Sequence, residues 1–221
     1  MIVRTKAFTR AGLAGNPSDG YFGKTLSVTF RNFYAEVTMY ETPDLEILPN
    51  DRDHSYFKNL EHLVKDVQRH GYYGGIRLIK AAAKKFFDYC QEKGIVLADR
   101  NFTVRYKSNI PVQVGLAGSS AIVTATIRAL MTFYGVEIPK PQVPSLILSV
   151  ETDELRISAG LQDRVVQVYE GLVYMDFDKT LIETQGYGEY DNLDANLLPP
   201  IYIAYLADLS EISGIAHGRL R

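Results

Sequence analysis

Apolar and polar residues alternate along two stretches in the first forty residues of the chain. Residues 1–8 and 25–40 (T-L-S-V-T-F-R-N-F-Y-A-E-V-T-M-Y) are rich in valine, threonine, phenylalanine and tyrosine, the residue types that favour strands. Residues 102–106 alternate in the same way, and residues 171–177 and 201–207 are short runs of strand composition. This pattern predicts strands at all five places.

Three other stretches have the spacing of an amphipathic helix. Residues 74–93 carry apolar side chains at intervals of three and four, with lysine and aspartate on the opposite face. Residues 119–134 are rich in alanine, threonine and leucine. Residues 144–156 begin with a proline, which suits the first turn of a helix. We therefore expect a helix at each of these three places.

The intervening segments are richer in glycine, proline and polar residues. Residues 10–24 (R-A-G-L-A-G-N-P-S-D-G-Y-F-G-K) are expected to form a loop, and a loop this long between strands indicates a functional role. Residues 51–70 are polar and fit a surface helix or an irregular segment. Residues 178–200 are polar, end in L-L-P-P and are the best candidate for a domain boundary or crossover.

Because strands and helices do not strictly alternate, the order of elements favours an α+β layered sheet over a doubly wound parallel sheet. We expect residues 1–195 to form one domain. The residues that follow, 196–221, are too few to fold alone.

Composition narrows the class of protein. The 221 residues carry 24 basic and 26 acidic side chains, a net charge of −2, whereas nucleic-acid binding needs a basic surface. The single cysteine, Cys90, lies in an expected helix and cannot form an internal disulfide. The apolar stretches are too short or too interrupted to span a bilayer. We expect a cytoplasmic protein without nucleic-acid or membrane partners.

The strongest chemical signal is the sequence P-V-Q-V-G-L-A-G-S-S-A at residues 111–121. It predicts a strand that enters a glycine-containing loop, followed by a helix that begins with two serines. Glycine lets a backbone approach a ligand closely, and the positive end of a helix favours an anion such as phosphate. An ordinary strand–turn–helix with serine caps is the structural alternative.

This motif resembles the phosphate-binding motif of the GHMP kinase superfamily, and two further segments in the expected order strengthen the resemblance. Residues 10–24 occupy the place of its N-terminal substrate motif, with G-N-P-S-D-x-x-x-G-K similar to the glucuronokinase branch. Residues 151–164 (E-T-D-E-L-R-I-S-A-G-L-Q-D-R) are similar to the stretch in which a helical glutamate precedes G-x-x-D. The segment H-G-Y-Y-G-G at residues 70–75 also resembles that branch.

The resemblance covers essentially the whole chain, but no third glycine-rich motif of the superfamily follows Gly186. It implies that residues 1–195 form the GHMP kinase N-terminal domain, a layered sheet with helices like domain 2 of ribosomal protein S5. It also implies that residues 196–221 are only the beginning of an incomplete C-terminal α+β domain. It also implies ATP and Mg²⁺ as cofactors. The expected ATP-binding residues are Pro111, Gly115, Leu116, Ala117, Gly118, Ser119, Ser120 and Ala121.

By the same resemblance, Ser120 and Glu151 are the expected Mg²⁺ ligands, consistent with the preference of Mg²⁺ for hard oxygen donors. Asp163 is the expected catalytic base, and Arg10 is expected to keep this carboxylate ionised or to stabilise charge on the transferred group. The structural alternatives are a solvated helix carboxylate for Glu151, a helix cap for Asp163 and a surface side chain for Arg10.

The substrate-binding candidates come from two regions. Asn16 and Asp19 are expected to hydrogen-bond sugar hydroxyls, although both residue types are also common in turns. The carboxylate of a uronic acid further calls for a guanidinium or an array of N–H donors. Arg164 and Arg77 are candidates, and the sequence does not choose between them. The full set of expected substrate-binding residues is Asn16, Ser18, Asp19, Tyr73 and Arg164.

The resemblance implies an ATP-dependent sugar kinase that phosphorylates the anomeric hydroxyl of D-glucuronate and gives glucuronate 1-phosphate for UDP-glucuronate synthesis. Two alternatives remain. One is a kinase of the same superfamily that acts on a neutral sugar or a heptose phosphate. The other is a non-catalytic, nucleotide-binding regulatory module.

Overall fold

The computed structural model describes residues 1–50, 53 and 74–205. Its largest element is a long antiparallel hairpin of β1 (Ile2–Ala14) and β2 (Lys24–Thr42). Through residues 35–42, β2 also pairs with β4 (Asn101–Ser108), and through residues 24–28 it pairs with β5 (Leu172–Asp176). The short β3 (Glu46–Ile47) and β6 (Glu189–Leu193) complete a six-stranded sheet.

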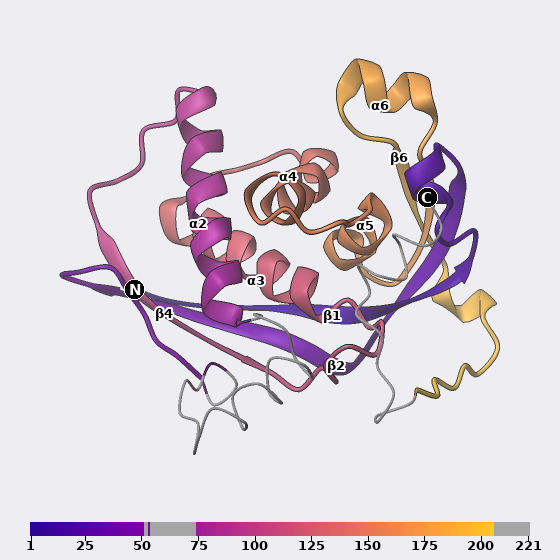
Figure 1. Ribbon diagram of the computed structural model, residues 1–221, viewed down its shortest axis with the longest axis horizontal. Helices are drawn as coiled ribbons and strands as arrows, with labels where there is room; N and C mark the ends of the chain where they lie inside the picture. Colours follow the sequence, from indigo (N-terminus) through magenta and orange to yellow (C-terminus); the bar gives the residue numbers. More distant parts are fainter. Residues whose placement is uncertain (51–52, 54–73, 206–221) are drawn as a thin grey trace.

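Four helices cover one side of this sheet (Figure 1). They are α2 (Gly75–Glu92), α3 (Gly118–Tyr134), α4 (Val143–Ser149) and α5 (Leu161–Tyr169). A π-helical turn, η4 (Val150–Glu154), extends α4. The α6 helix (Lys179–Gln185) precedes β6, and short 3-10 turns lie at Ser18–Tyr21 (η1), Lys140–Gln142 (η3) and Ala195–Leu197 (η5). The expected α+β layered sheet is confirmed.

The core between the sheet and the helices explains this arrangement. Alternate residues of β1 and β2, such as Ala7 and Val37, are fully buried, and so is Phe133 on α3. The Phe133 ring meets Phe102 of β4 edge to face at a centroid distance of 5.5 Å, a favourable aromatic geometry. This contact fixes α3 against the sheet, and the loop that leads into α3 carries the glycine motif.

The two longest expected helices are confirmed, but several other boundaries differ. The expected loop at residues 10–24 is too long, because β1 continues to Ala14 and its last residues pair with β2 across an irregularity between Gly12 and Ala14. The expected helix at residues 144–156 ends earlier, because η4 replaces its last α-helical turn and Arg156 adopts a positive φ of 57°.

Two expected strands are wrong. Residues 111–114 form no strand, because β4 ends at Ser108 and turns lead from there to α3. Residues 201–205 are not in a strand, and residues 206 and 207 lie outside the described residues. Residues 54–70 of the polar segment are also outside the described part. The helices α5 and α6 and the strand β6 were not expected, because short amphipathic elements leave little periodicity to detect.

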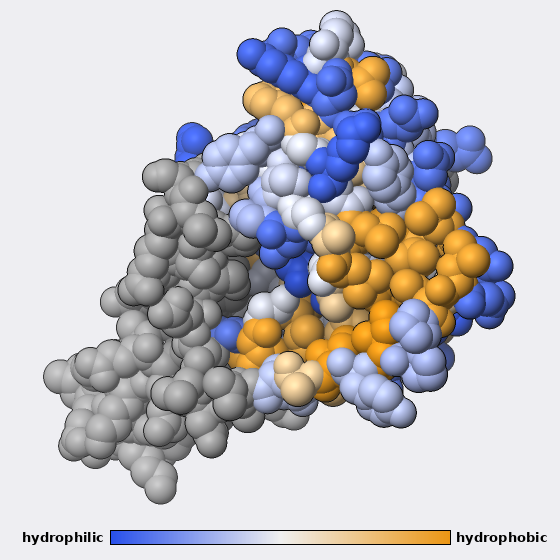
Figure 2. Space-filling model, turned by 90° about the vertical axis from the view of Figure 1, so that its right-hand side faces the viewer, coloured by the Kyte–Doolittle hydropathy of each residue, from blue (hydrophilic) through white to orange (hydrophobic). Residues whose placement is uncertain are grey.

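The face on the right of Figure 1 is uneven in polarity. Figure 2 shows hydrophilic side chains over the upper part of this face and hydrophobic ones gathered at its lower right. The segment after β6 exposes several large apolar side chains, namely Leu197, Ile201, Tyr202, Ile203 and Tyr205.

Among the described residues, no helix is both long and apolar enough to cross a membrane.

We expect Phe133→Ala to lower the free energy of unfolding by about 3–5 kcal/mol, because it removes a fully buried ring and leaves a cavity under α3. Phe87→Ala on α2 is the matched control, since that side chain is 49% exposed, and its effect should stay within about 0.5 kcal/mol. Urea unfolding measures both variants. Equal losses would contradict the packing described for α3.

Candidate active site

Arg10 joins three segments that are far apart in the sequence. Its Nε donates a hydrogen bond to Oδ1 of Asp163 at 2.5 Å, and its Nη1 donates to the carbonyl of Gly115 at 2.8 Å. Arg10 lies on β1, Asp163 in the first turn of α5 and Gly115 in the loop before α3. The side chains of Arg10 and Asp163 are only 15% and 18% exposed, so this is a partly desolvated, charge-assisted hydrogen bond.

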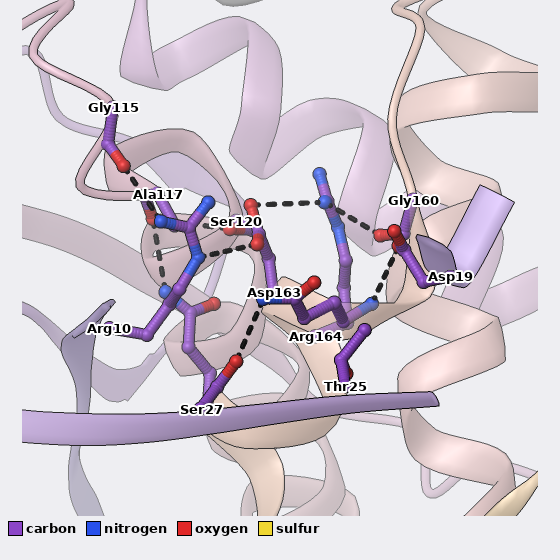
Figure 3. Close-up of polar contacts among 12 residues, drawn as sticks. Arg10, Asp19, Thr25, Ser27, Gly115, Ala117, Ser120, Gly160, Asp163 and Arg164 are labelled. Carbon is purple, nitrogen blue, oxygen red and sulfur yellow. Dashed lines mark hydrogen bonds and ion pairs between the residues drawn. The ribbon is translucent and has the colours of Figure 1, made fainter. Parts of the chain in front are cut away.

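A second guanidinium lies on the other side of Asp163 (Figure 3). Nη1 of Arg164 is 3.5 Å from Oδ2 of Asp163 and donates to the carbonyl of Gly160 at 2.9 Å. Nε of Arg164 donates to Oε2 of Glu151 at 2.9 Å, and Nη2 donates to the same oxygen. The structure therefore places Asp163 between two positive charges, and these stabilise its negative charge.

The Arg164–Glu151 pair is deeply buried, with side chains 6% and 2% exposed. Burial alone lowers the pKa of the Arg164 guanidinium, but the neighbouring carboxylates, first Glu151 and then Asp163, outweigh burial and raise that pKa above its usual value. In this pair the opposite charges offset part of the cost of burying each other. Glu151, Arg164, Asp163 and Arg10 thus form a row of alternating charges.

Residues 109–117, which we call the glycine loop, connect β4 to α3. Hydrogen bonds from Arg10 and from Gln167 hold this loop. Its backbone adopts positive φ at Gln113 (61°), Gly115 (76°) and Ala117 (56°). Besides the Arg10 contact to Gly115, the Ala117 carbonyl accepts hydrogen bonds from Nε2 of Gln167 at 3.0 Å and from Oγ of Ser120 at 3.1 Å. A Cβ added at Gly115 would meet no atom within 4 Å, so glycine serves the backbone conformation there.

The eight expected ATP-binding residues lie together on this loop and on the first turn of α3. Ala117 is the N-cap of that helix and supplies no side-chain cap. A helix of 17 residues directs the positive end of its dipole at this loop, an arrangement suited to a phosphate group. Within this set, the side chains of Leu116, Ser120 and Ala121 are buried, so they anchor the loop and the first turn of α3 in the protein interior.

The expected metal ligands fit Mg²⁺ by their chemistry. Both hydrogen bonds that the Glu151 side chain accepts from Arg164 fall on Oε2, so Oε1 can coordinate a cation, and Ser120 adds a hydroxyl oxygen. Across the described residues, no group of three His, Cys, Asp or Glu side chains could hold a metal ion. Mg²⁺ bound together with phosphates needs only one or two protein ligands.

Among the substrate-binding candidates, three lie at the tip of the β1–β2 hairpin. Ser18 donates through Oγ to the Lys24 carbonyl at 2.8 Å. Oδ2 of Asp19 accepts a hydrogen bond from the backbone N–H of Gln162 at 3.1 Å, which brings this tip to the start of α5. Asn16 lies in the same turn. Arg164 is buried on Glu151 instead of facing the surface, and Tyr73 lies outside the described residues.

Two glutamines that support the site were not expected from the sequence. Gln167 is fully buried and bonded to Ala117 of the glycine loop. Gln162 is 1% exposed, and its Nε2 donates to Oγ of Ser27 at 2.7 Å. The sequence spacing could have indicated Gln167, because this residue follows Asp163 by four positions and so shares a helix face with it.

Known proteins resemble this chain in sequence and in fold. Residues 77–171 match the family model of the GHMP kinases N terminal domain. Glucuronokinase 1 of Arabidopsis thaliana is 46% identical over 222 residues, covering 99% of this chain and 61% of the relative. Probable glucuronokinase 2 of the same plant is 48% identical over 224 residues, covering 100% and 61%. The chain thus spans about three fifths of the length of these relatives.

The fold also has a match among solved structures. Mevalonate kinase of Methanococcus jannaschii superposes with a TM-score of 0.61, at 20% sequence identity, over 88% of this chain and 56% of that chain. At this identity the likeness concerns the fold.

We expect Arg164→Met to lower the free energy of unfolding by about 3–5 kcal/mol, because it leaves the Glu151 carboxylate buried without its partner. The double variant Glu151→Gln/Arg164→Met should recover part of this loss. Lys179→Met, which removes an exposed ion pair with Glu183 on α6, should change stability by less than about 1 kcal/mol. Urea unfolding measures the free energy of unfolding of the three variants. If Arg164→Met lost as little stability as Lys179→Met, the description of Arg164 and Glu151 as a buried ion pair would be refuted.

Proposed function

The chain belongs to the GHMP kinase family, and on that premise we propose that it is an ATP-dependent sugar kinase acting on D-glucuronate. It transfers the γ-phosphoryl group of ATP to the anomeric C1 hydroxyl and gives glucuronate 1-phosphate, a precursor for UDP-glucuronate synthesis. The identity of 46% and 48% to two proteins named as glucuronokinases supports this sugar acid as the substrate.

The observation that carries the proposal is the position of Asp163 between Arg10 and Arg164. Phosphoryl transfer depends mainly on positioning and on electrostatic stabilisation. Asp163 accepts the proton of the C1 hydroxyl as its O–H bond breaks, while the new O–P bond forms and ADP leaves. The two guanidiniums hold the carboxylate in place beforehand, and Arg10 connects it to the phosphate-binding loop through Gly115.

The glycine loop and the first turn of α3 bind the ATP phosphates in this scheme. The backbone there approaches the phosphates closely, and the positive end of the helix dipole favours their negative charge. Ser120 and Glu151 would hold Mg²⁺, which supplies positive charge to the phosphates when it is bound. Arg164 fixes the orientation of Glu151 through Oε2.

For the carboxylate of the sugar acid, the structure favours Arg77 over Arg164. Arg164 is buried and bonded to Glu151 and Gly160. Arg77 is exposed in the first turn of α2, and its Nη2 donates to the Leu155 carbonyl at 3.2 Å. This places it beside the segment that leads into α5, with guanidinium donors left for a carboxylate.

We expect ATP consumption with Mg²⁺ to require D-glucuronate and to be absent with galactose, galacturonate or no sugar. Asp163→Ala should lower kcat by at least about 10²-fold, the usual contribution of a positioned base. Asp153→Ala removes a 64% exposed carboxylate from η4. It is the control for loss of a nearby carboxylate and should keep the activity.

A coupled assay of ADP release is run on this chain and on a chain extended to the length of the curated relatives. Turnover on galactose would make the protein a neutral-sugar kinase. Full activity of Asp163→Ala would remove the proposed base. If neither chain released ADP with any of the sugars, the kinase proposal would be contradicted.

We expect Arg77→Met to raise KM for D-glucuronate about 10–100-fold, the loss typical of a charge-assisted hydrogen bond, with little change in kcat. Arg77→Lys should restore part of the affinity. Arg105→Met removes an exposed guanidinium from β4 and should leave KM unchanged. Steady-state kinetics measure this, and an unchanged KM in Arg77→Met would rule out Arg77 as the carboxylate-binding residue.

A further inference from the structure

The helix that carries Asp163 has no capping side chain of its own. The N-cap of α5 is Gly160, in an extended conformation with φ −125° and ψ 168°. A helix leaves its first N–H groups without intrahelical acceptors, and a serine, threonine, aspartate or asparagine side chain at the N-cap normally supplies one. Glycine cannot do so. The start of α5 therefore depends on an acceptor from elsewhere.

Asp19 supplies this acceptor from a position 143 residues earlier in the chain. Its Oδ2 accepts the backbone N–H of Gln162, the second residue of α5, at 3.1 Å (Figure 3). A carboxylate at this place also interacts favourably with the positive end of the helix dipole. By comparison, α6 is capped from within, because Asp178 accepts from the N–H groups of Thr180 and Leu181.

The glycine at position 160 is what makes room for this contact. A Cβ added there would lie 2.1 Å from Oδ2 of Asp19, a distance that real Cβ atoms do not show. The φ of Gly160 is one that other residues adopt easily, so the need for glycine here is the space that the Asp19 carboxylate occupies. An alanine at this position would displace the carboxylate without changing its chemistry.

The turn that holds Asp19 is itself fixed to the sheet. The Gly23 N–H donates to the Ser18 carbonyl at 2.9 Å, and Oγ of Ser18 donates to the Lys24 carbonyl at 2.8 Å. Lys24 begins β2, which lies at the centre of the sheet. The position of the Asp19 carboxylate is thereby determined by β2, and the position of the α5 N-terminus is determined by the carboxylate.

We propose that Asp19 is a positioning residue, which caps α5 from the β1–β2 turn and so holds Asp163 and Arg164 in a fixed position relative to that turn. The consequence for catalysis rests on the proposed function, because it requires Asp163 to be the base. This role differs from hydrogen bonding to a sugar hydroxyl, since it operates in the absence of sugar. Asp163 is the third residue of α5, so displacement of the first turn displaces the carboxylate directly.

Four variants test the proposal. Asp19→Ala removes the acceptor, and Gly160→Ala displaces it by steric overlap. Asp19→Asn keeps an oxygen at the same place, and asparagine caps helices about as well as aspartate. Asp178→Ala removes the cap of α6 and is the matched control for loss of a cap away from the site.

The first measurement is hydrogen–deuterium exchange of residues 161–165 in sugar-free protein. Asp19→Ala and Gly160→Ala should speed exchange there about fivefold, as loss of a typical cap implies, while Asp19→Asn and Asp178→Ala should leave it near the wild-type rate. Unchanged exchange in both disrupting variants would overturn the proposal, whether or not the protein phosphorylates any sugar.

The second measurement is the split between kcat and KM on D-glucuronate. A misplaced base should lower kcat on the order of 10–100-fold in Asp19→Ala and Gly160→Ala, with substantial rescue in Asp19→Asn and no change in Asp178→Ala. Faster exchange with an unchanged kcat would make Asp19 a helix cap only and would overturn the positioning role. Absence of kinase activity from both the wild-type chain and the extended chain would instead contradict the proposed function, and the exchange result would still show whether Asp19 caps α5.

Discussion

The site depends on the compensation of charge in a partly desolvated row of four side chains. A carboxylate such as Glu151, at 2% exposure, is stable as an anion only with a cation in contact. Arg164 is that cation, and its remaining donors reach Asp163 and the Gly160 carbonyl. Arg10 completes the row from β1. Because each charge has a partner on at least one side, Asp163, the helix that carries it and the loop before α3 are held relative to one another in the absence of substrate.

The fold supplies these four residues from elements that the sheet holds in place. The long β1–β2 hairpin carries Arg10 near its end and Asp19 at its tip, so both contacts to α5 originate from one rigid unit. The helix α3 is fixed by Phe133, and its preceding loop is bonded to both Arg10 and Gln167. A substitution of Arg10, Asp19, Phe133 or Gln167 should therefore change the position of the Asp163 carboxylate.

The sequence predicted which segments lie together better than it predicted the contacts between their side chains. The three motifs point to Arg10, the glycine loop and Asp163, and the structure brings these together. The helices at residues 74–93 and 119–134 were predictable because each is long and periodic. The burial of Arg164 on Glu151 was not predictable. The two residues are 13 positions apart, and the π-helical turn and loop between them leave no periodic signal in the sequence. The capping of α5 by Asp19 was equally hidden, because a cap normally stands next to its helix in the sequence.

The central claim is that Asp163, held between two guanidiniums, meets the hydroxyl that receives the phosphoryl group. A crystal structure with D-glucuronate and a non-hydrolysable ATP analogue tests it most directly. The account predicts the C1 hydroxyl oxygen within about 2.6–3.2 Å of an Asp163 carboxylate oxygen, with the analogue's phosphates on the loop before α3. A sugar whose hydroxyls all lie beyond hydrogen-bond reach of Asp163, with the phosphates in the same loop, would contradict it.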